Sequence, residues 1–446
     1  MCTRLVHANG PLTGDLQVPG DKSVSHRVTL MPLLADGICR AAGWLDSADT
    51  RASLAAVRAL GSRADLAGDV LTVDARPAVA AMQQGGGPPL EIDCGNSGTT
   101  ARLLMGLLSG WLPPDGRAVV LDGDASLRGR PMARIATPLA AMGARIAWLG
   151  EPDRLPVQVQ AAPLRACDHE LPVASAQLKS ALLLAGLRAA GRSTVRGGGD
   201  SRDHTERLLR TMGVEVTTGP GDVLGIEGGA AVSNFDVEVP GDLSTAAFLL
   251  VAAALVPGSR VTVRQVGLGP GRTGLLEVLR RAGAVVEVTA QSVADPAREP
   301  VGDITLSRDA LRPFTVGAGE VPALVDELPA LAVLAAICPG VSTVTGAGEL
   351  RHKESDRIAL MARGLTRLGG DVTERPDGWV IKGGQPLTAG GSGGPVVLAT
   401  AGDHRVAMAL SLAAMVASGE STLDDDECVA VSFPNFFATL AGLVSR

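Results

Sequence analysis

One six-residue phrase occurs twice in the chain, and this duplication constrains the architecture more than any other feature. Residues 18–23 read Val-Pro-Gly-Asp-Lys-Ser, and residues 239–244 read Val-Pro-Gly-Asp-Leu-Ser. In both copies Pro and Gly end a β-like run, and Asp and Ser can cap a following helix. The phrases therefore predict two strand-to-helix entries in two related halves. Lys22 stands where the second copy has Leu243. A lysine at a helix N-terminus opposes the helix dipole, so it predicts a bound anion there.

Six apolar helices are predicted at a period of roughly 66 to 82 residues. They cover residues 22–37, 97–110, 175–191, 243–258, 323–340 and 404–419. Amphipathic helices alternate with them at 53–61, 134–143, 205–213, 274–283 and 355–369, with a less regular sixth copy near 433–443. Strand-like runs such as 119–121, 157–159, 261–266 and 285–288 fill the gaps. Each half is therefore expected to contain three units that mix strands with two helices.

The two phrases are expected to be the crossings between two α/β (α+β) domains. One domain is predicted to comprise residues 21–240, and the other residues 1–20 with 241–446, because the first strand precedes the first crossing. Two crossings make a hinge that permits closure over a ligand. If the apolar helices of each domain run parallel, their positive N-terminal ends converge on the interdomain cleft and favour anions there.

Composition excludes several classes of protein. The 446 residues are 46% hydrophobic but only 2% aromatic, with no Tyr, and the net charge is −7. A single-stranded nucleic-acid binder, which needs aromatic stacking platforms and positive charge, is disfavoured. The six cysteines lack CxxC pairs, so neither a zinc site nor a disulfide framework is predicted. The longest apolar run, 246–256, is too short to span a bilayer. We therefore expect a soluble protein of a reducing compartment.

Most polar residues of interest lie at the starts of the predicted helices. Ser23, Ser97 and Ser244 are interpreted as ordinary caps, but capping does not explain the basic residues beside them. Ser23 and Arg27 share a face of the predicted helix, and Lys22 lies at the start of that helix. This arrangement suits the binding of a phosphate. His26 is expected to be packed rather than to act as a base.

Residues 351–357, Arg-His-Lys-Glu-Ser-Asp-Arg, form the densest ionic run. If they are helical, Lys353 and Arg357 share a face, where like charges repel unless a polyanion binds. A solvated helix face with compensating acidic residues explains the run equally well.

Arg128 and Arg130 lie in a Gly- and Asp-rich stretch, 122–131, which is expected to be a mobile loop. Paired arginines in such a loop could close over a carboxylate or phosphate. The alternative interpretation is an ordinary surface loop.

Two carboxylates, Asp326 and Glu354, suit proton transfer if the fold brings them to one substrate, although Asp326 can also be read as a helix cap.

Residues 269–274 match the GxGxxG pattern of dinucleotide-binding proteins. No doubly wound α/β alternation surrounds this match, so it is interpreted as a turn. Neither a phosphate-binding P-loop nor a metal-ligand motif is present in the sequence.

With these pieces assembled, the chain resembles the 5-enolpyruvylshikimate-3-phosphate synthase family (3-phosphoshikimate 1-carboxyvinyltransferases), which belongs to the enolpyruvyl transferases. The matching blocks span nearly the whole chain in family order. They are Gly20 to Arg27, Gly95 to Arg102, Arg130-Pro131, Ser175-Ala176-Gln177, Asp326, Lys353 to Arg357 and Asp403-His404-Arg405. The resemblance implies two inside-out α/β domains, each of three pseudo-symmetric βαβαββ-type units, joined by a double-crossover hinge.

The resemblance also implies the reaction and the residues that serve it. Enolpyruvyl would pass from phosphoenolpyruvate to the 5-hydroxyl of shikimate 3-phosphate in the shikimate pathway to chorismate and the aromatic amino acids, with release of phosphate and without metal or organic cofactor. Shikimate 3-phosphate would be held by Lys22, Ser23, Arg27, Ser175, Ala176, Gln177, Arg202, Asp326 and Lys353. Phosphoenolpyruvate would be held by Lys22, Asn96, Gly98, Arg130, Gln177, Arg357 and Arg405. Asp326, Glu354 and Lys22 would be the catalytic residues.

The sequence departs from the family pattern at two places. Val431 stands where many members have a lysine that contacts phosphoenolpyruvate, and Gly269-Pro270-Gly271-Arg272 replaces the usual Asn-Pro-x-Arg. The nearest alternative is a UDP-N-acetylglucosamine enolpyruvyl transferase, but the reactive Cys of its loop is missing from residues 122–131. A noncatalytic anion-binding protein of the same fold is a second alternative. The chain is expected to be a cytoplasmic monomer that acts on small molecules, without nucleic-acid or membrane partners.

Overall fold

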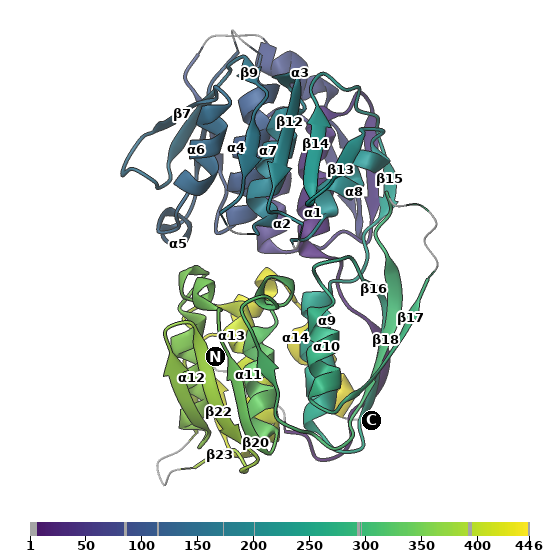
Figure 1. The fold of residues 1–446 in the computed structure, drawn as a ribbon, viewed down its shortest axis with the longest axis vertical. Coiled ribbons are helices and arrows are strands. Elements are labelled where there is room, and N and C mark those ends of the chain that lie inside the picture. The colour runs from purple at the N-terminus through teal and green to yellow at the C-terminus, as the bar shows by residue number, and fades with distance from the viewer. Residues whose placement is uncertain are drawn as a thin grey trace. The chain divides into compact units, whose positions relative to one another are not determined.

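The computed structural model describes residues 7–83, 87–113, 116–172, 174–199, 201–291, 295, 297–390 and 395–444. The chain divides into two compact units (Figure 1). The Lys22 unit comprises Gly20–Pro240 together with the short segment Val293–Glu299, and the Arg357 unit comprises Met1–Pro19, Gly241–Ser292 and Pro300–Arg446, so far as these residues are described. None of the described helices is long and apolar enough to cross a membrane.

The Lys22 unit contains three sheets of one design. In each, the edge strand pairs in parallel with its neighbour and the remaining strands are antiparallel, as in the pairing of Leu90 with Val119 and then of Val119 with Val159. The strand orders are β15 (Asp236–Glu238), β2 (Ile38–Ala42), β4 (Val70–Asp74), β3 (Arg63–Ala67); β5 (Leu90–Asp93), β6 (Val119–Asp122), β8 (Val157–Gln160), β7 (Arg145–Trp148); and β10 (Asp168–Glu170), β12 (Arg192–Arg196), β14 (Val223–Glu227), β13 (Val216–Gly219). The short strands β9 (Leu164–Arg165) and β11 (Ala189–Ala190) form a further pair.

Three apolar helices lie inside this unit, and the amphipathic helices lie nearer its surface. The helices are α1 (Lys22–Leu30), the 3-10 helix η1 (Met31–Leu34), α2 (Ala48–Ala59), α3 (Arg76–Gln83), α4 (Gly98–Trp111), α5 (Ala125–Arg128), α6 (Ala133–Ala141), α7 (Ala176–Gly186) and α8 (His204–Thr211). Helices α4 and α7 run side by side (Figure 1), and a Cβ atom added to Gly106 would meet the Ala181 backbone at 2.4 Å. Only glycine permits this approach of the two helices.

The Arg357 unit repeats the design twice and then shortens it. Its strand orders are β1 (Thr13–Gln17), β16 (Arg260–Gly267), β18 (Val301–Ser307), β17 (Val285–Ala290); β19 (Thr315–Val316), β20 (Gly340–Val344), β22 (Gly378–Gly383), β21 (Asp371–Arg375); and the pairs β24 (Val396–Leu398) with β26 (Ser421–Leu423) and β23 (Thr388–Ala389) with β25 (Ser418–Gly419). Within the described residues, the third repeat has no antiparallel strand after β26.

In the Arg357 unit, too, the apolar helices lie inside and the amphipathic helices lie nearer the surface. The helices of this unit are α9 (Leu243–Leu255), α10 (Gly274–Arg281), η2 (Val321–Ala323), α11 (Leu328–Ile337), η3 (Gly348–His352), α12 (Arg357–Arg367), α13 (His404–Val416), η4 (Glu427–Val431) and α14 (Phe436–Val444). Every residue of α9 is buried, as a helix that is apolar on all sides requires. The mixed α/β fold with threefold repeats is confirmed by these sheets and helices.

At each crossing between the units, the strand before the crossing and the helix after it belong to different units. Strand β1 precedes α1 in the chain, yet it pairs with β16 in the Arg357 unit. Strand β15 precedes α9, yet it pairs with β2 in the Lys22 unit. The repeated phrases follow these two strands directly, and each leads from the end of a strand into a helix, α1 or α9.

Local predictions differ from the structure in three places. The helix predicted from residue 323 begins at Leu328, because Pro329 fits only the first turn of a helix. Residues 122–131 do not form a simple loop, since β6 ends at Asp122 and α5 is capped by Asp124. The caps of α1 and α9 are Asp21 and Asp242 rather than the serines two residues later, whereas Ser97 does cap α4.

Candidate active site

Lys22 is the first residue of α1, as predicted, but an anion of the protein lies beside it. Its Nζ is 3.0 Å from Oδ2 of Asp49, in the first turn of α2. Sequence reasoning missed Asp49 because the two residues are brought together only by the packing of α1 on α2. Leu243, at the matching position of the second phrase, is fully buried in the Arg357 unit. The duplicated position is therefore partly exposed and charged in one unit and part of the apolar core in the other.

Arg27 is buried and fixed by three different elements. Its Nε donates to Thr205 Oγ1 at 2.6 Å, its Nη2 to Ser180 Oγ at 2.7 Å, and its Nη1 to the carbonyl of Ser23 at 2.8 Å. Burial lowers the pKa of Arg27 to about 10, although the nearby charge of Glu206 opposes the shift. At neutral pH the guanidinium remains charged, with its orientation set by α1, α7 and α8.

The starts of α4 and α7 are joined by side-chain hydrogen bonds. Gln177 accepts a bond from Nη1 of Arg102 at 2.7 Å and donates to Thr99 at 2.9 Å. A Cβ atom added to Gly98 would lie 2.9 Å from Nη1 of Arg102 and 3.5 Å from Nη1 of Arg130. Two guanidinium groups therefore lie next to the N-terminus of α4, where the helix dipole also favours an anion.

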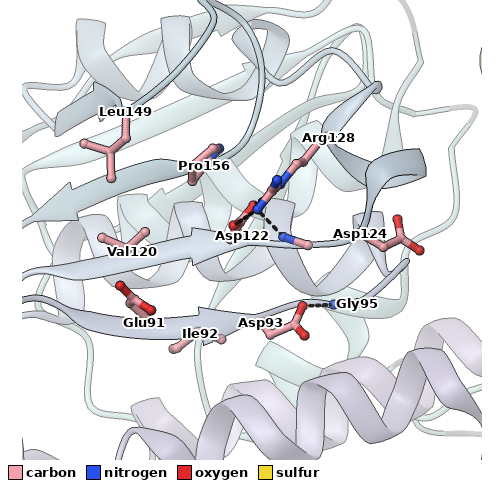
Figure 2. Close-up of a pocket in the computed structure, with 11 residues that line it drawn as sticks. Glu91, Ile92, Asp93, Gly95, Val120, Asp122, Asp124, Arg128, Leu149 and Pro156 are labelled. Carbon is pink, nitrogen blue, oxygen red and sulfur yellow. Dashed lines mark hydrogen bonds and ion pairs between the residues drawn. The ribbon is translucent and has the colours of Figure 1, made fainter.

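The two arginines of the Arg128-Gly129-Arg130 sequence have different partners. Arg130 is buried and donates to Oδ1 of Asn96, just before α4. Arg128 instead pairs with Asp122 at the edge of a surface cavity of about 460 Å³ (Figure 2). Glu91, Asp93, Asp122 and Asp124 also line this cavity. Its acidic wall makes it a poor anion site, so Arg130 is the better anion ligand of the two.

The remaining predicted residues of the Lys22 unit lie at helix starts. Ser175 is the N-cap of α7 and accepts from the Leu178 N–H, and Ala176 is the first residue of that helix. Ser23 follows Lys22 in α1, and Arg202 lies two residues before the first residue of α8. All four residues are partly exposed.

In the Arg357 unit, three carboxylates surround one buried guanidinium. Arg357, only 1% exposed, donates from Nε to Asp403 at 2.8 Å and from Nη2 to Glu354 at 2.6 Å, and its Nη1 lies 3.5 Å from Oδ1 of Asp326. Burial alone would lower the pKa of Arg357, but the charges of Asp403, Glu354 and Asp326 outweigh burial and raise it. Arg405 joins the group, with Nε 3.7 Å from Asp326.

The two candidate catalytic carboxylates are therefore neighbours of one arginine. The side chains of Asp326 and Glu354 are 16% and 25% exposed, whereas Asp403 is fully buried. Asp326 is not a helix cap, since Glu327 occupies the N-cap position of α11. Asp403 caps α13 through Oδ1 and receives Arg357 and Ser355 on Oδ2. Its role in orienting Arg357 was not predicted, because nothing in the local pattern places it beside α12.

Lys353 and Arg357 do not share a helical face, contrary to the prediction. The 3-10 helix η3 ends at His352 with Lys353 as its C-cap, and α12 begins at Arg357, with Asp356 as its N-cap. Nζ of Lys353 lies 3.7 Å from Glu349 rather than in the arginine cluster. The expected repulsion between the two cations therefore does not arise from helical spacing.

Three other expectations can be compared with the structure. His26 is fully buried, as predicted, with Nδ1 2.8 Å from Oγ of Ser53. Among the described residues, one group has ligand atoms close enough to hold a metal ion, formed by Asp203, His204 and Glu299. His204 is already bonded to Glu299, and Asp203 to Arg207, so protein partners occupy these groups. Residues 270–273 form a turn before α10, in agreement with the rejection of a dinucleotide motif.

Comparison with known proteins shows the family of the chain. The family model described as EPSP synthase (3-phosphoshikimate 1-carboxyvinyltransferase) matches residues 6–440. The chain belongs to the EPSP synthase family. A 3-phosphoshikimate 1-carboxyvinyltransferase of Synechococcus sp. (strain WH7803) is 46% identical over 99% of this chain and 98% of the relative, and one of Geobacter sp. (strain M21) is 43% identical over 97% of each.

Solved structures lead to the same family. An EPSP synthase structure from Acinetobacter baumannii matches with a TM-score of 0.82 and 38% identity, covering 99% of this chain and 98% of that one. These matches favour EPSP synthase over a UDP-N-acetylglucosamine enolpyruvyl transferase and over a noncatalytic anion-binding protein. The chain is thus a transferase of the shikimate pathway that acts on small molecules.

Proposed function

We propose that this chain transfers enolpyruvyl from phosphoenolpyruvate to the 5-hydroxyl of shikimate 3-phosphate with residues drawn from both units. The observation that carries the proposal is the cluster in which Asp326 and Glu354 flank Arg357 and Arg405. It combines two partly exposed carboxylates, which can move protons, with two buried guanidiniums, which attract anions.

Each substrate has its own set of binding residues in this proposal. Shikimate 3-phosphate is bound by Lys22, Ser23, Arg27, Ser175, Ala176, Gln177, Arg202, Asp326 and Lys353. Phosphoenolpyruvate is bound by Lys22, Asn96, Gly98, Arg130, Gln177, Arg357 and Arg405. The salt bridges of Lys22 with Asp49 and of Arg357 with Glu354 support these roles, because they orient the cations in the absence of substrate. The Lys22 unit would mainly bind shikimate 3-phosphate, and the Arg357 unit would supply the catalytic carboxylates.

The chemistry proceeds by addition and then elimination. Asp326 takes the proton of the 5-hydroxyl, whose oxygen attacks C2 of phosphoenolpyruvate, while Glu354, assisted by Lys22, delivers a proton to the C3 methylene. The resulting tetrahedral intermediate returns a proton from C3 to the Glu354 carboxylate and expels phosphate, which restores the double bond. Arginines and Lys22 stabilise the carboxylate and the departing phosphate, which are anionic throughout. The proposal includes no metal ion or organic cofactor.

We also propose that the enzyme works as a cytoplasmic monomer without nucleic acid. The net charge of −7 supports the absence of a nucleic-acid partner, because binding to phosphates requires a basic surface. Sedimentation at several protein concentrations would test the oligomeric state.

The deciding assay is release of phosphate from phosphoenolpyruvate with shikimate 3-phosphate, compared with UDP-N-acetylglucosamine as the acceptor. Asp326→Ala and Glu354→Gln are expected to lower kcat by about 100-fold or more, because general acid–base catalysis contributes about 10²- to 10⁴-fold. The affinity of Glu354→Gln for shikimate 3-phosphate should stay within about threefold of wild type by calorimetry, whereas Asp326→Ala also removes one ligand of that substrate and should bind it somewhat more weakly, by less than the loss in kcat. Glu374→Gln is the matched control, since Glu374 is an exposed partner of Arg351. Turnover with the UDP sugar alone, or full activity of both variants, would refute the proposal.

A further inference from the structure

A short segment between two strands of the Arg357 unit packs within the Lys22 unit. The chain leaves β17 at Ala290, and its residues 297–299, here called the clasp, belong to the Lys22 unit before β18 begins at Val301. Three bonds attach the clasp to α8. His204 lies 2.7 Å from Glu299 through Nδ1 and Oε1, Arg207 donates to the Arg298 carbonyl at 2.8 Å, and Thr211 donates to the Ala297 carbonyl at 3.1 Å.

The three attached residues of α8 lie on one helical face. Positions 204, 207 and 211 follow the spacing i, i+3, i+7, which places them along one side of a helix. The residues between them serve other partners. Thr205 accepts the bond from Nε of Arg27, and Glu206 forms a buried ion pair with Lys179 at 2.7 Å. Helix α8 therefore holds Arg27 through one face while the clasp holds α8 through another.

The start of α8 depends on the clasp because it has no side-chain cap. Asp203 occupies the N-cap position but makes no capping hydrogen bond, and its carboxylate instead pairs with Arg207 at 2.9 Å. Glu299 supplies the negative charge that a helix N-terminus favours. Burial would raise the pKa of Glu299, but the charge of His204 and its hydrogen bond outweigh burial and hold that pKa below its usual range. The carboxylate is therefore ionised at neutral pH.

We propose that Glu299 is a positioning residue for shikimate 3-phosphate, acting through His204 on the start of α8 and hence on Arg202 and Arg27. Arg202 lies two residues before His204, and Arg27 is bonded to the residue after it. This inference rests on the proposed function, in which Arg202 and Arg27 bind that substrate. Glu299 itself touches neither substrate in the proposal, so its removal should alter the binding of one substrate rather than the chemical step.

The test is steady-state kinetics of Glu299→Gln with each substrate varied in turn. We expect KM for shikimate 3-phosphate to rise about tenfold, while kcat and KM for phosphoenolpyruvate stay within about twofold. Glu299→Asp keeps the charge and should remain within about threefold of wild type. Glu287→Gln is the matched control, because Glu287 lies on β17 of the same hairpin and pairs with exposed Arg260. Its kinetic constants should be those of wild type.

A double-mutant cycle shows whether Glu299 acts through His204. In the His204→Gln background, Glu299→Gln should add no more than about twofold to KM for shikimate 3-phosphate. Independent, additive effects would overturn the inference, as would an equal rise of both KM values or an unchanged KM. If Glu299→Gln does not fold, Glu299→Asp is compared with His204→Gln. The inference then requires His204→Gln, but not Glu299→Asp, to raise KM for shikimate 3-phosphate. A wild-type protein that does not turn over would refute the proposed function itself, whereas normal turnover with an unaffected Glu299→Gln would refute this inference alone.

Discussion

Replacing Asp403 by Asn should disturb the Arg357 cluster without changing the size of the side chain. Asp403 is fully buried and accepts from four donors. Its Oδ1 receives the backbone N–H groups of Arg405 and Val406, and its Oδ2 receives Ser355 Oγ and Arg357 Nε. Asparagine has one acceptor oxygen and one NH₂ group, so either orientation of its amide turns a donor toward two donors.

The cost can be worked from these bonds. One orientation loses the cap of α13, worth about 1 kcal/mol, and the other loses the charged hydrogen bond of Arg357, worth about 1.5–3 kcal/mol. In both cases the buried guanidinium loses one of its three carboxylate neighbours, which adds an electrostatic cost. We therefore expect a loss of about 2–3 kcal/mol in the free energy of unfolding. For a unit of this size, the melting temperature should fall by about 5–10 °C.

Thermal unfolding followed by circular dichroism measures this loss, and steady-state kinetics measures its effect on the site. A less firmly held Arg357 should raise KM for phosphoenolpyruvate by about tenfold. Asp377→Asn is the control, because the side chain of Asp377 accepts one bond, from the Gly346 N–H, in a partly exposed turn. A melting temperature within 1–2 °C of wild type for Asp403→Asn would refute the reasoning that this carboxylate is needed to hold the arginine.

Two further predictions concern the Lys22 unit. Burial lowers the pKa of His26 to about 3. Between about pH 6.5 and pH 3 the unfolded chain therefore binds a proton at this histidine that the folded chain does not. The free energy of unfolding should fall as the pH falls through this range, by up to about 1.4 kcal/mol per pH unit. His26→Asn should show a shallower pH dependence of the melting temperature, and parallel profiles would contradict this. We also propose that Gly98 leaves space for the inhibitor glyphosate beside the phosphoenolpyruvate site. Gly98→Ala should then raise the inhibition constant of glyphosate and KM for phosphoenolpyruvate, because the new Cβ would lie 2.9 Å from Nη1 of Arg102. An unchanged inhibition constant would reject the idea.

The repeats could be predicted from the sequence because their signals are local. Six apolar helices recur at a regular period, and a helix that is apolar on all sides has to be buried, as α9 is. Helix boundaries were predicted less well where a cap or a proline decides them. The break between η3 and α12 separates Lys353 from Arg357, and it depends on Asp356 as a cap rather than on hydrophobic spacing.

The candidate site was predicted only in part. Its cations lie at helix starts, which sequence reading finds readily from caps and charges. Their partners could not be found in this way, because Asp49 reaches Lys22, and Arg102 reaches Gln177, only through helix packing. The clasp also escaped prediction, since Glu299 is 95 residues from His204 in the chain.

Repeated units in a duplicated chain, with basic residues at the helix starts, can be read from the amino-acid sequence alone, since periodicity, capping and helix dipoles act over a few neighbouring residues. The packing of distant elements selects which carboxylates surround Arg357 and which of Arg128 and Arg130 contacts Asn96. Those choices depend on distances between side chains far apart in the chain. Hydrogen bonds and ion pairs form only within about 3–4 Å, so only the packed helices and sheets can select them.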